Sequence, residues 1–151
     1  MKNKVSMKIS HGKISINYNH PHDIATIIEN YVLDVYRSRL INKSDTVLDL
    51  GAGIGEFSSI ASKKVGSRGT VIAIEPSPDD YETLLTNLKE NQCHNVISIN
   101  AAVADFRGEL ELNFKRNMFK SMCEPLQDIL NERNVGKIDF CKMDIEEEKR
   151  K

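Results

Sequence analysis

The spacing of apolar and polar positions changes several times along the chain. Residues 5–18 alternate between apolar and polar around His11-Gly12, which predicts a β-hairpin. Helical spacing then begins near Pro21, and Asp23 is the expected N-cap of this helix. The apolar face of the predicted helix consists of Ile24, Ile27, Ile28, Tyr31 and Val35.

From residue 46 onward, short apolar runs alternate with amphipathic segments. The predicted strands are 46–50, 70–74, 95–101 and 137–145, with a further extended piece at 109–114. The predicted helices lie between Gly55 and Gly66, at 80–92 and at 125–133. Nearly continuous apolar strands separated by helices indicate βαβ units. We therefore expect an α/β fold of the Rossmann-like type with a mostly parallel sheet, formed by residues 46–151, and an N-terminal hairpin and helix (1–45) packed on it.

Composition narrows the function classes. The 151 residues are 40% hydrophobic with a formal net charge of −1, which suits one globular domain. A pI near 6.4 argues against a nucleic-acid partner, and no apolar run approaches the roughly 18 residues that span a membrane. The three cysteines form no disulfide or metal pattern, and the N-terminus has no apolar signal segment, so we expect a cytoplasmic protein.

The first candidate ligand-binding residues directly follow the first strand of the predicted sheet. In open parallel sheets, ligands bind beyond the carboxyl ends of the strands. Gly51, Ala52 and Gly53 follow the first strand, where glycines allow a tight turn and a close approach of the backbone to a ligand. By itself, this glycine-rich loop is equally consistent with an ordinary strand–helix turn.

The next two strands end in residues that suit a nucleoside. Glu75 follows the second strand, where its carboxylate can accept hydrogen bonds from both hydroxyls of a ribose. Adenine is expected near Pro76-Ser77 and near Ala101-Ala102, whose small side chains leave room for a flat ring.

The glycine spacing separates two kinds of cofactor. Nicotinamide dinucleotides are typically bound by GxGxxG, but here the glycines run GxGxG and Glu56 stands at the third glycine position. Asp49, two residues before Gly51, would repel a pyrophosphate and attract an ammonium group. A nucleoside with an amino-acid tail fits best, and we expect S-adenosylmethionine.

Four segments in order resemble the FkbM family of S-adenosylmethionine-dependent methyltransferases. They read VLDLGAGIGEFSSIA, VIAIEPSPDDYETLLTNLKEN, VISINAAVADFRGELEL and IDFCKMDIE. The resemblance implies a class I methyltransferase fold and methylation of a hydroxyl on a sugar or polyketide-like small molecule. From the composition we expect neither nucleic acid nor a membrane among the partners. Asp144, at the end of the fourth strand, is the candidate catalytic residue that takes the hydroxyl proton or holds the substrate.

The fourth motif departs from the family, because Glu147 replaces a glycine and the chain ends four residues later. The resemblance implies three further strands, so the sequence is interpreted as a truncated core. An unpaired strand at 138–145 would then associate with a second copy or a complementing chain. The alternative is a non-catalytic partner subunit that retains the fold.

Several residues receive structural interpretations. His20 and His22 have no third ligand in the sequence, so no metal site is expected. Cys141 is expected to be a small buried side chain, and Met118, Phe119 and Met122 are expected to be packing residues.

Overall fold

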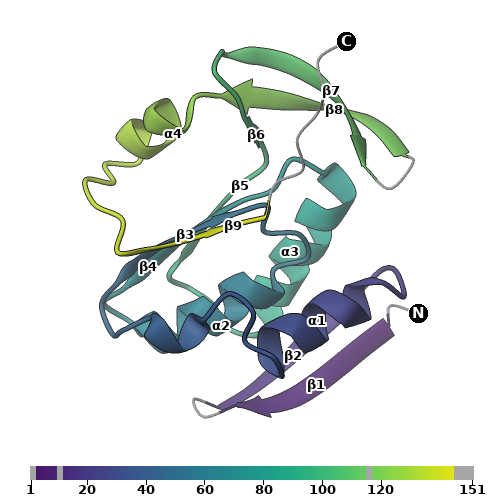
Figure 1. Cartoon of the computed structure of the whole chain (residues 1–151), viewed down its shortest axis with the longest axis vertical. Helices are drawn as coiled ribbons and strands as arrows, with labels where there is room; N and C mark the ends of the chain where they lie inside the picture. Colours follow the sequence, from purple (N-terminus) through teal and green to yellow (C-terminus); the bar gives the residue numbers. More distant parts are fainter. Residues whose placement is uncertain (1–2, 10–11, 115–116, 145–151) are drawn as a thin grey trace.

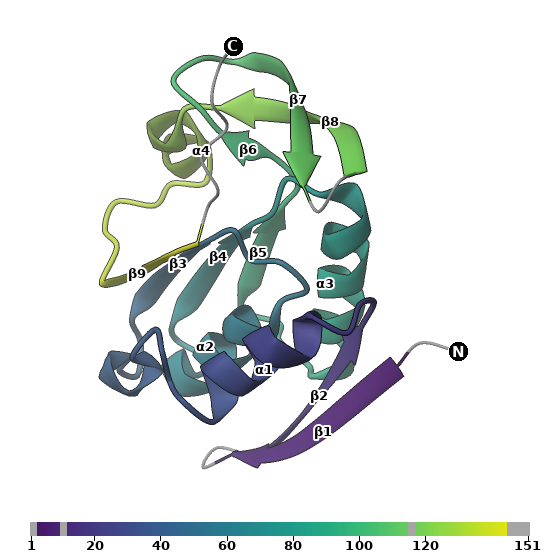
Figure 2. The same cartoon turned by 45° about the vertical axis from the view of Figure 1, so that its right-hand side comes forward.

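A four-stranded parallel sheet forms the centre of the fold. The structure is a computed structural model, and it describes residues 3–9, 12–114 and 117–144. The strands β3 (Thr46–Leu50), β4 (Thr70–Ile74), β5 (Val96–Ile99) and β9 (Phe140–Met143) lie in the order β5-β4-β3-β9. All three pairings are parallel, and Figure 2 shows the strands side by side. The predicted α/β fold with a mostly parallel sheet is confirmed.

Helices cover both faces of this sheet. On one face, α2 (Glu56–Val65) and α3 (Pro78–Glu90) bury two apolar clusters. On the other face, α4 (Leu126–Glu132), at the upper left in Figure 1, covers a third cluster. In this cluster Leu48, Ile72 and Ile129 are almost fully buried. Strands buried on both sides need apolar residues at every position, which explains the continuous apolar runs of β3 and β4.

The N-terminal segment packs against α2 and α3. The antiparallel strands β1 (Asn3–Ile9) and β2 (Gly12–Tyr18) form the predicted hairpin, whose turn residues 10 and 11 lie outside the described residues. Ile14 and Ile16 of β2 are fully buried in a cluster that includes Ile60 of α2. The hairpin is therefore held to the core by its apolar face.

The first helix, α1 (Asp23–Tyr31), is shorter than predicted. Asp23 begins the helix instead of capping it, because its carboxylate accepts the backbone N–H groups of the preceding turn at residues 19 and 20. Val35 lies beyond the helix, since the chain turns at Asp34 in a left-handed conformation. Ile24 and Ile28, predicted to lie on the buried face, are exposed.

Asn87 of α3 and Asn91, the C-cap residue of the same helix, bind the outer edge of β2. Asn91 accepts the backbone N–H of Ser15 and donates to its carbonyl, at 2.8 and 2.7 Å. Asn87 does the same for Asn17, at 2.7 and 2.9 Å, and it also donates to the carbonyl of Ile54 in the glycine loop. The two side-chain amides lie one helical turn apart. They form the hydrogen bonds with the backbone of β2 that a neighbouring strand would otherwise form.

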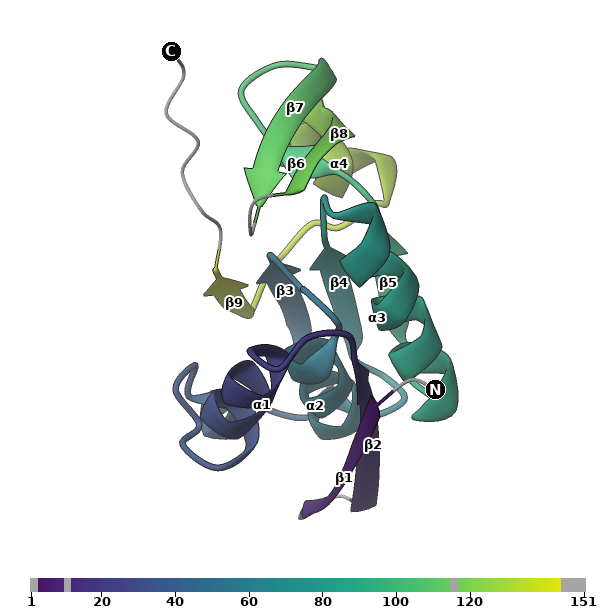
Figure 3. The same ribbon diagram turned by 90° about the vertical axis from the view of Figure 1, so that its right-hand side faces the viewer.

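A second small sheet lies beyond the carboxyl ends of β3 and β4. It contains β6 (Ala102–Val103), β8 (Asn117–Glu124) and β7 (Gly108–Phe114) in that order (Figure 3). The sequence analysis did not predict β8. The packing role predicted for Met118 and Met122 is wrong, because alternate residues of β8 point outward and both are more than half exposed.

The last strands are shorter than predicted. β5 ends at Ile99 because the side chain of Asn100 donates to the carbonyls of Glu75 and Pro76, and the chain then leaves the sheet. β9 covers only 140–143 of the predicted 137–145, and residues 145–151 lie outside the described residues. Cys141 is exposed, contrary to prediction, because α4 covers β3 and β4 on that face of the sheet but not β9.

Within the ranges that the structure describes, no helix is both long and apolar enough to cross a bilayer.

Candidate cofactor site

The candidate site lies where the strand order of the sheet reverses. β3 has β4 on one side and β9 on the other, so the loops after β3 and β9 diverge at the carboxyl edge. A crevice at such a point is where ligands bind in open α/β sheets. The structure brings the predicted residues after β3, β4 and β9 together at this edge.

The glycine loop follows β3 directly. Gly51, Gly53 and Gly55 all have positive φ values, of 71°, 55° and 84°, which L side chains rarely adopt. The N–H groups of Gly51 and Ala52 both donate to the carbonyl of Ile74, which fixes the loop to the end of β4. The conformation therefore requires the glycines that the sequence provides.

Glu75 joins the two loops that follow β3 and β4. One carboxylate oxygen accepts the N–H of Gly53 at 2.7 Å, and the other accepts the N–H of Ser77 at 2.8 Å. Burial raises the pKa of Glu75 to about 7, although the two N–H donors work in the opposite direction. Each oxygen keeps a further lone pair, so the predicted bonds to ribose hydroxyls remain possible.

The carboxylate of Asp49, predicted to attract an ammonium group of the ligand, already has partners within the protein. It is fully buried in β3, where one oxygen accepts the hydroxyl of Ser58 at 2.6 Å and the other lies 3.1 Å from the ammonium of Lys142. Burial acts to lower the pKa of Lys142, but Asp49 and Glu56 outweigh it, and that pKa lies above its usual value. Lys142 is therefore cationic and already neutralises Asp49.

Lys142 also supports the glycine loop. Its ammonium donates to the carbonyl of Gly51 at 2.6 Å and lies 5.1 Å from the centre of the Tyr36 ring. Tyr36 in turn donates its hydroxyl to Asp144 at 2.6 Å. The candidate catalytic residue is thus exposed at the carboxyl end of β9 and bound to the N-terminal segment.

The residues predicted near adenine lie on two loops. Ser77 is the N-cap of α3, where its hydroxyl accepts the N–H of Asp80, and Pro76 is half-buried beside it. Ala101 packs in the apolar cluster that α4 covers, and Ala102 of β6 pairs with Cys123 of β8. Both alanines are buried, and their contact with adenine stays a prediction.

Two of the supporting residues described above, Lys142 and Tyr36, did not emerge from the sequence analysis as ligands or supports. Neither did Glu56, which lies beside Gly53, nor Asn30, whose side-chain amide donates to Glu56 at 3.2 Å. Three of them come from segments outside the glycine motif, and only the fold brings them to it. Glu56 was noticed as a departure from glycine spacing, which is the one signal in the sequence that could have identified it.

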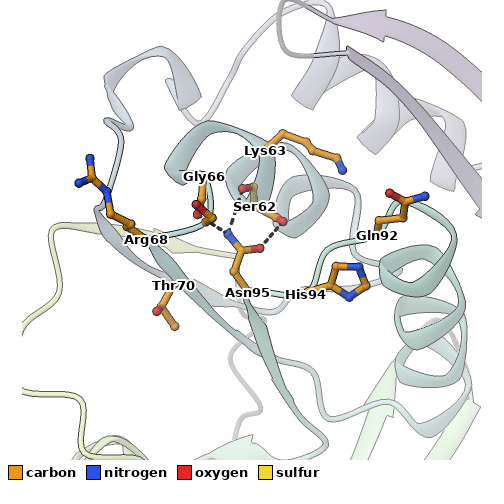
Figure 4. A pocket seen from close by; sticks show the side chains of 10 residues that line it. Ser62, Lys63, Gly66, Arg68, Thr70, Gln92, His94 and Asn95 are labelled. Atoms are coloured by element: carbon orange, nitrogen blue, oxygen red, sulfur yellow. Dashed lines mark hydrogen bonds between the residues drawn. The ribbon is translucent and has the colours of Figure 1, made fainter.

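A pocket of about 530 Å³ lies at the opposite, amino-terminal edge of the sheet. Figure 4 shows Lys63, Arg68 and His94 around it, with Asn95 bonded to Ser62 and Gly66. No carboxylate occurs among the residues that line it, all of which the structure describes. Its place at the amino ends of β4 and β5 separates this pocket from the cofactor site.

The two histidines of the N-terminal segment form a local structure. The rings of His20 and His22 stack with centroids 5.2 Å apart, and His22 lies 3.0 Å from Asp23. Across the described ranges, no three His, Cys, Asp or Glu side chains are grouped so that they could hold a metal ion.

Comparison with known proteins identifies the relationship. The sequence model of the TRM5/TYW2 methyltransferase domain matches residues 19–138. The 23S rRNA (uracil(1939)-C(5))-methyltransferase RlmD of Acinetobacter baylyi is 36% identical over 56 residues, which are 37% of this chain and 12% of that protein. The ribosomal RNA large subunit methyltransferase E of Methanothermobacter thermautotrophicus is 51% identical over 37 residues, 24% of this chain and 18% of that protein. The matches thus span less than a fifth of these curated relatives.

Solved structures were compared as well. TYW2 of P. horikoshii in complex with MeSAdo superposes with a TM-score of 0.47 at 23% identity, covering 72% of this chain and 40% of that chain. A SAM-dependent methyltransferase from Aquifex aeolicus gives a TM-score of 0.45 at 23% identity, covering 56% and 48%.

The family match confirms the predicted class I methyltransferase fold and S-adenosylmethionine as the cofactor. The matched family is not the FkbM family that the motifs resemble. The prediction of a small-molecule hydroxyl substrate without nucleic acid is wrong, since both curated relatives are named as methyltransferases of ribosomal RNA. A net charge near zero is a sum over the whole chain, and it does not exclude a local basic surface.

Proposed function

Because the chain belongs to the TRM5/TYW2 methyltransferase domain family, we propose that it binds S-adenosylmethionine at the carboxyl edge of its sheet and methylates RNA. The observation that carries the cofactor site is the bridge made by Glu75. Its carboxylate accepts the N–H groups of Gly53 and Ser77, at 2.7 and 2.8 Å, and so links the loops that follow β3 and β4. A buried carboxylate with lone pairs facing such a loop suits the two hydroxyls of a ribose.

When bound, the cofactor would supply a methyl group carried on a positively charged sulfur, for transfer to a nucleophilic group of the substrate. The contribution of the chain is alignment and proton handling. Asp144 is exposed where β9 ends, so a macromolecular substrate can reach it. The hydroxyl of Tyr36 donates to one of its oxygens, which leaves the other oxygen to accept a proton or a hydrogen bond from the acceptor group.

RNA is favoured by the two curated relatives, which are named for ribosomal RNA, and by the distribution of charge. Lys8 and Lys13 are exposed and directly opposite one another in the hairpin, an arrangement that like charges destabilise. Asn91 connects the hairpin to the pocket at the amino-terminal edge of the sheet. Its side chain binds Ser15 of β2, and its backbone carbonyl accepts a hydrogen bond from Lys63. We name Lys8, Lys13, Lys63, Arg68 and His94 the basic edge, and we propose that it contacts RNA phosphates.

The cofactor site is tested by Glu75→Ala. We expect this variant to bind S-adenosylmethionine more weakly by about 1.5–3 kcal/mol, the range for hydrogen bonds to a charged group, as measured by titration calorimetry. Glu82→Ala, on the exposed side of α3, is the matched control and should bind as the wild type does. Equal affinity in wild type and Glu75→Ala, with equal melting temperatures, would remove Glu75 from the site.

The substrate class is tested by following a labelled methyl group from S-adenosylmethionine. Transfer to RNA supports the proposal, with exposed Asp144→Asn expected to reduce the rate. Cofactor binding without transfer to any RNA fraction would instead favour the non-catalytic partner subunit.

A further inference from the structure

Apart from the Asp49 oxygen that faces Lys142, two buried acceptor atoms beside the glycine loop have no hydrogen-bond partner. One is an oxygen of Glu56, the first residue of α2, and the other is the side-chain oxygen of Asn30 in α1. The side chains belong to residues that are only 6% and 4% exposed. They touch each other, because the Asn30 amide donates to the second oxygen of Glu56 at 3.2 Å. Leaving buried acceptors unpaired is costly, and native structures contain few of them.

The charge around these atoms is also unbalanced. Asp49 and Glu56 are two buried carboxylates, and Lys142 is the cation packed against them. Lys142 is committed to Asp49 at 3.1 Å and to the carbonyl of Gly51 at 2.6 Å. The neighbouring cation therefore leaves Glu56 without a cation of its own, and without cofactor a proton fills this role for part of the time. A buried carboxylate in this position favours a second positive group.

The unpartnered oxygen of Glu56 faces the glycine loop. A Cβ atom at Gly53 would lie 3.9 Å from this oxygen, in ordinary contact with it. Gly53 is also the residue whose N–H binds Glu75, so the two carboxylates flank the same loop. A ligand whose ribose lies at Glu75 is therefore long enough to reach Glu56 on the other side of the glycine loop.

We propose that Glu56 and Asn30 bind the α-ammonium group at the amino-acid end of the cofactor. An ammonium group has three N–H donors and one positive charge, which matches the two unpaired acceptors and the uncompensated carboxylate. This inference rests on the proposed function, and it reassigns the role predicted for Asp49. It also makes α1 part of the cofactor site, since Asn30 lies outside the glycine motif.

The test compares two ligands that share adenosine and sulfur. S-adenosylhomocysteine carries the α-ammonium group, whereas 5′-methylthioadenosine ends in a methyl group. In Glu56→Gln, which keeps the size of the side chain, the Kd for S-adenosylhomocysteine should rise about tenfold or more, the range for losing a charged hydrogen bond. The Kd for 5′-methylthioadenosine should stay within about twofold, because that ligand makes no bond to Glu56.

The ratio of the two Kd values is the readout, because partial unfolding weakens both ligands alike. Asn30→Ser is a second variant and should shift the ratio in the same direction, while Glu82→Gln on the exposed side of α3 should leave it unchanged. Equal effects of Glu56→Gln on both ligands, or no effect, would overturn the inference alone. A wild-type chain that binds neither ligand would refute the proposed function, and this inference with it.

Discussion

At the scale of single residues, the site depends on how three charged side chains share a small buried volume. Lys142 is almost fully buried, which is rare for lysine unless it is paired, and here it is paired with Asp49. Glu56 has no such partner, and burial raises its pKa to about 7 against the lowering effect of Lys142. Asp49 and Asp23 add to the increase. The carboxyl group of Glu56 is therefore partly protonated near neutral pH.

This predicts a pH dependence of stability for the chain without cofactor. The pKa of Glu56 rises from 4.5 to about 7 on folding, so between these values the folded chain holds a proton that the unfolded chain has released. The free energy of unfolding should fall as pH rises through this window and then level off. Glu75 contributes in the same direction.

The check is urea denaturation at pH 5 and pH 8. Glu56→Gln should lose less stability between these two pH values than the wild type, by up to about 3 kcal/mol. An identical pH dependence in both proteins would show that Glu56 is ionised throughout.

At the scale of elements, the sequence predicts what depends on local periodicity. The hairpin, β3, β4 and α2 follow from alternation, continuous apolar runs and the glycines that end each segment. The predictions fail where a contact between residues far apart in the sequence determines where an element ends. Asn100, for example, ends β5 because its side chain donates to the carbonyls of Glu75 and Pro76. Lys142 could not be predicted as part of the site either, because only the pairing of β9 with β3 brings it to Asp49.

The asparagines of α3 give a prediction at this scale. Asn87 is fully buried and donates to the carbonyls of Asn17 and Ile54. Asn87→Asp keeps the shape but removes both donors, and each unpaired buried carbonyl costs about 1–3 kcal/mol. We expect a loss of at least about 3 kcal/mol in the free energy of unfolding, once the buried carboxylate is added. Asn131→Asp, exposed on α4, should change stability by less than about 0.5 kcal/mol, and a similar value for Asn87→Asp would contradict the role described for it.

At the scale of the whole molecule, the net charge of −1 conceals a separation of charge. The hairpin and the amino-terminal edge of the sheet carry the basic edge, whereas Glu75, Asp49 and Glu56 are buried toward the carboxyl edge. Composition is summed over the chain and carries no position, which is why it misled the prediction about nucleic acid.

The proposed RNA contact predicts a change in salt dependence. Replacing both Lys8 and Lys13 with serine should weaken RNA binding and make the slope of log K against log salt less steep by about 1.4, since each lost phosphate contact on single-stranded RNA accounts for about 0.7. The hairpin should stay folded, because the change removes two like charges that face each other. Lys120 and Lys137, paired with Glu109 and Asp139, are control positions whose replacement by serine should leave the slope unchanged. A slope unchanged in the double variant would place the RNA elsewhere.

Asn87 joins the hairpin to the glycine loop through a single side chain, and this has a thermodynamic consequence. Opening of the hairpin removes Asn17 from the Asn87 side chain, which also binds the carbonyl of Ile54 in the glycine loop of the proposed cofactor site. Hairpin opening and cofactor release therefore belong to one thermodynamic cycle, in which the coupling free energy is the same in both directions. A bound cofactor resists hairpin opening by the same amount by which a closed hairpin strengthens cofactor binding.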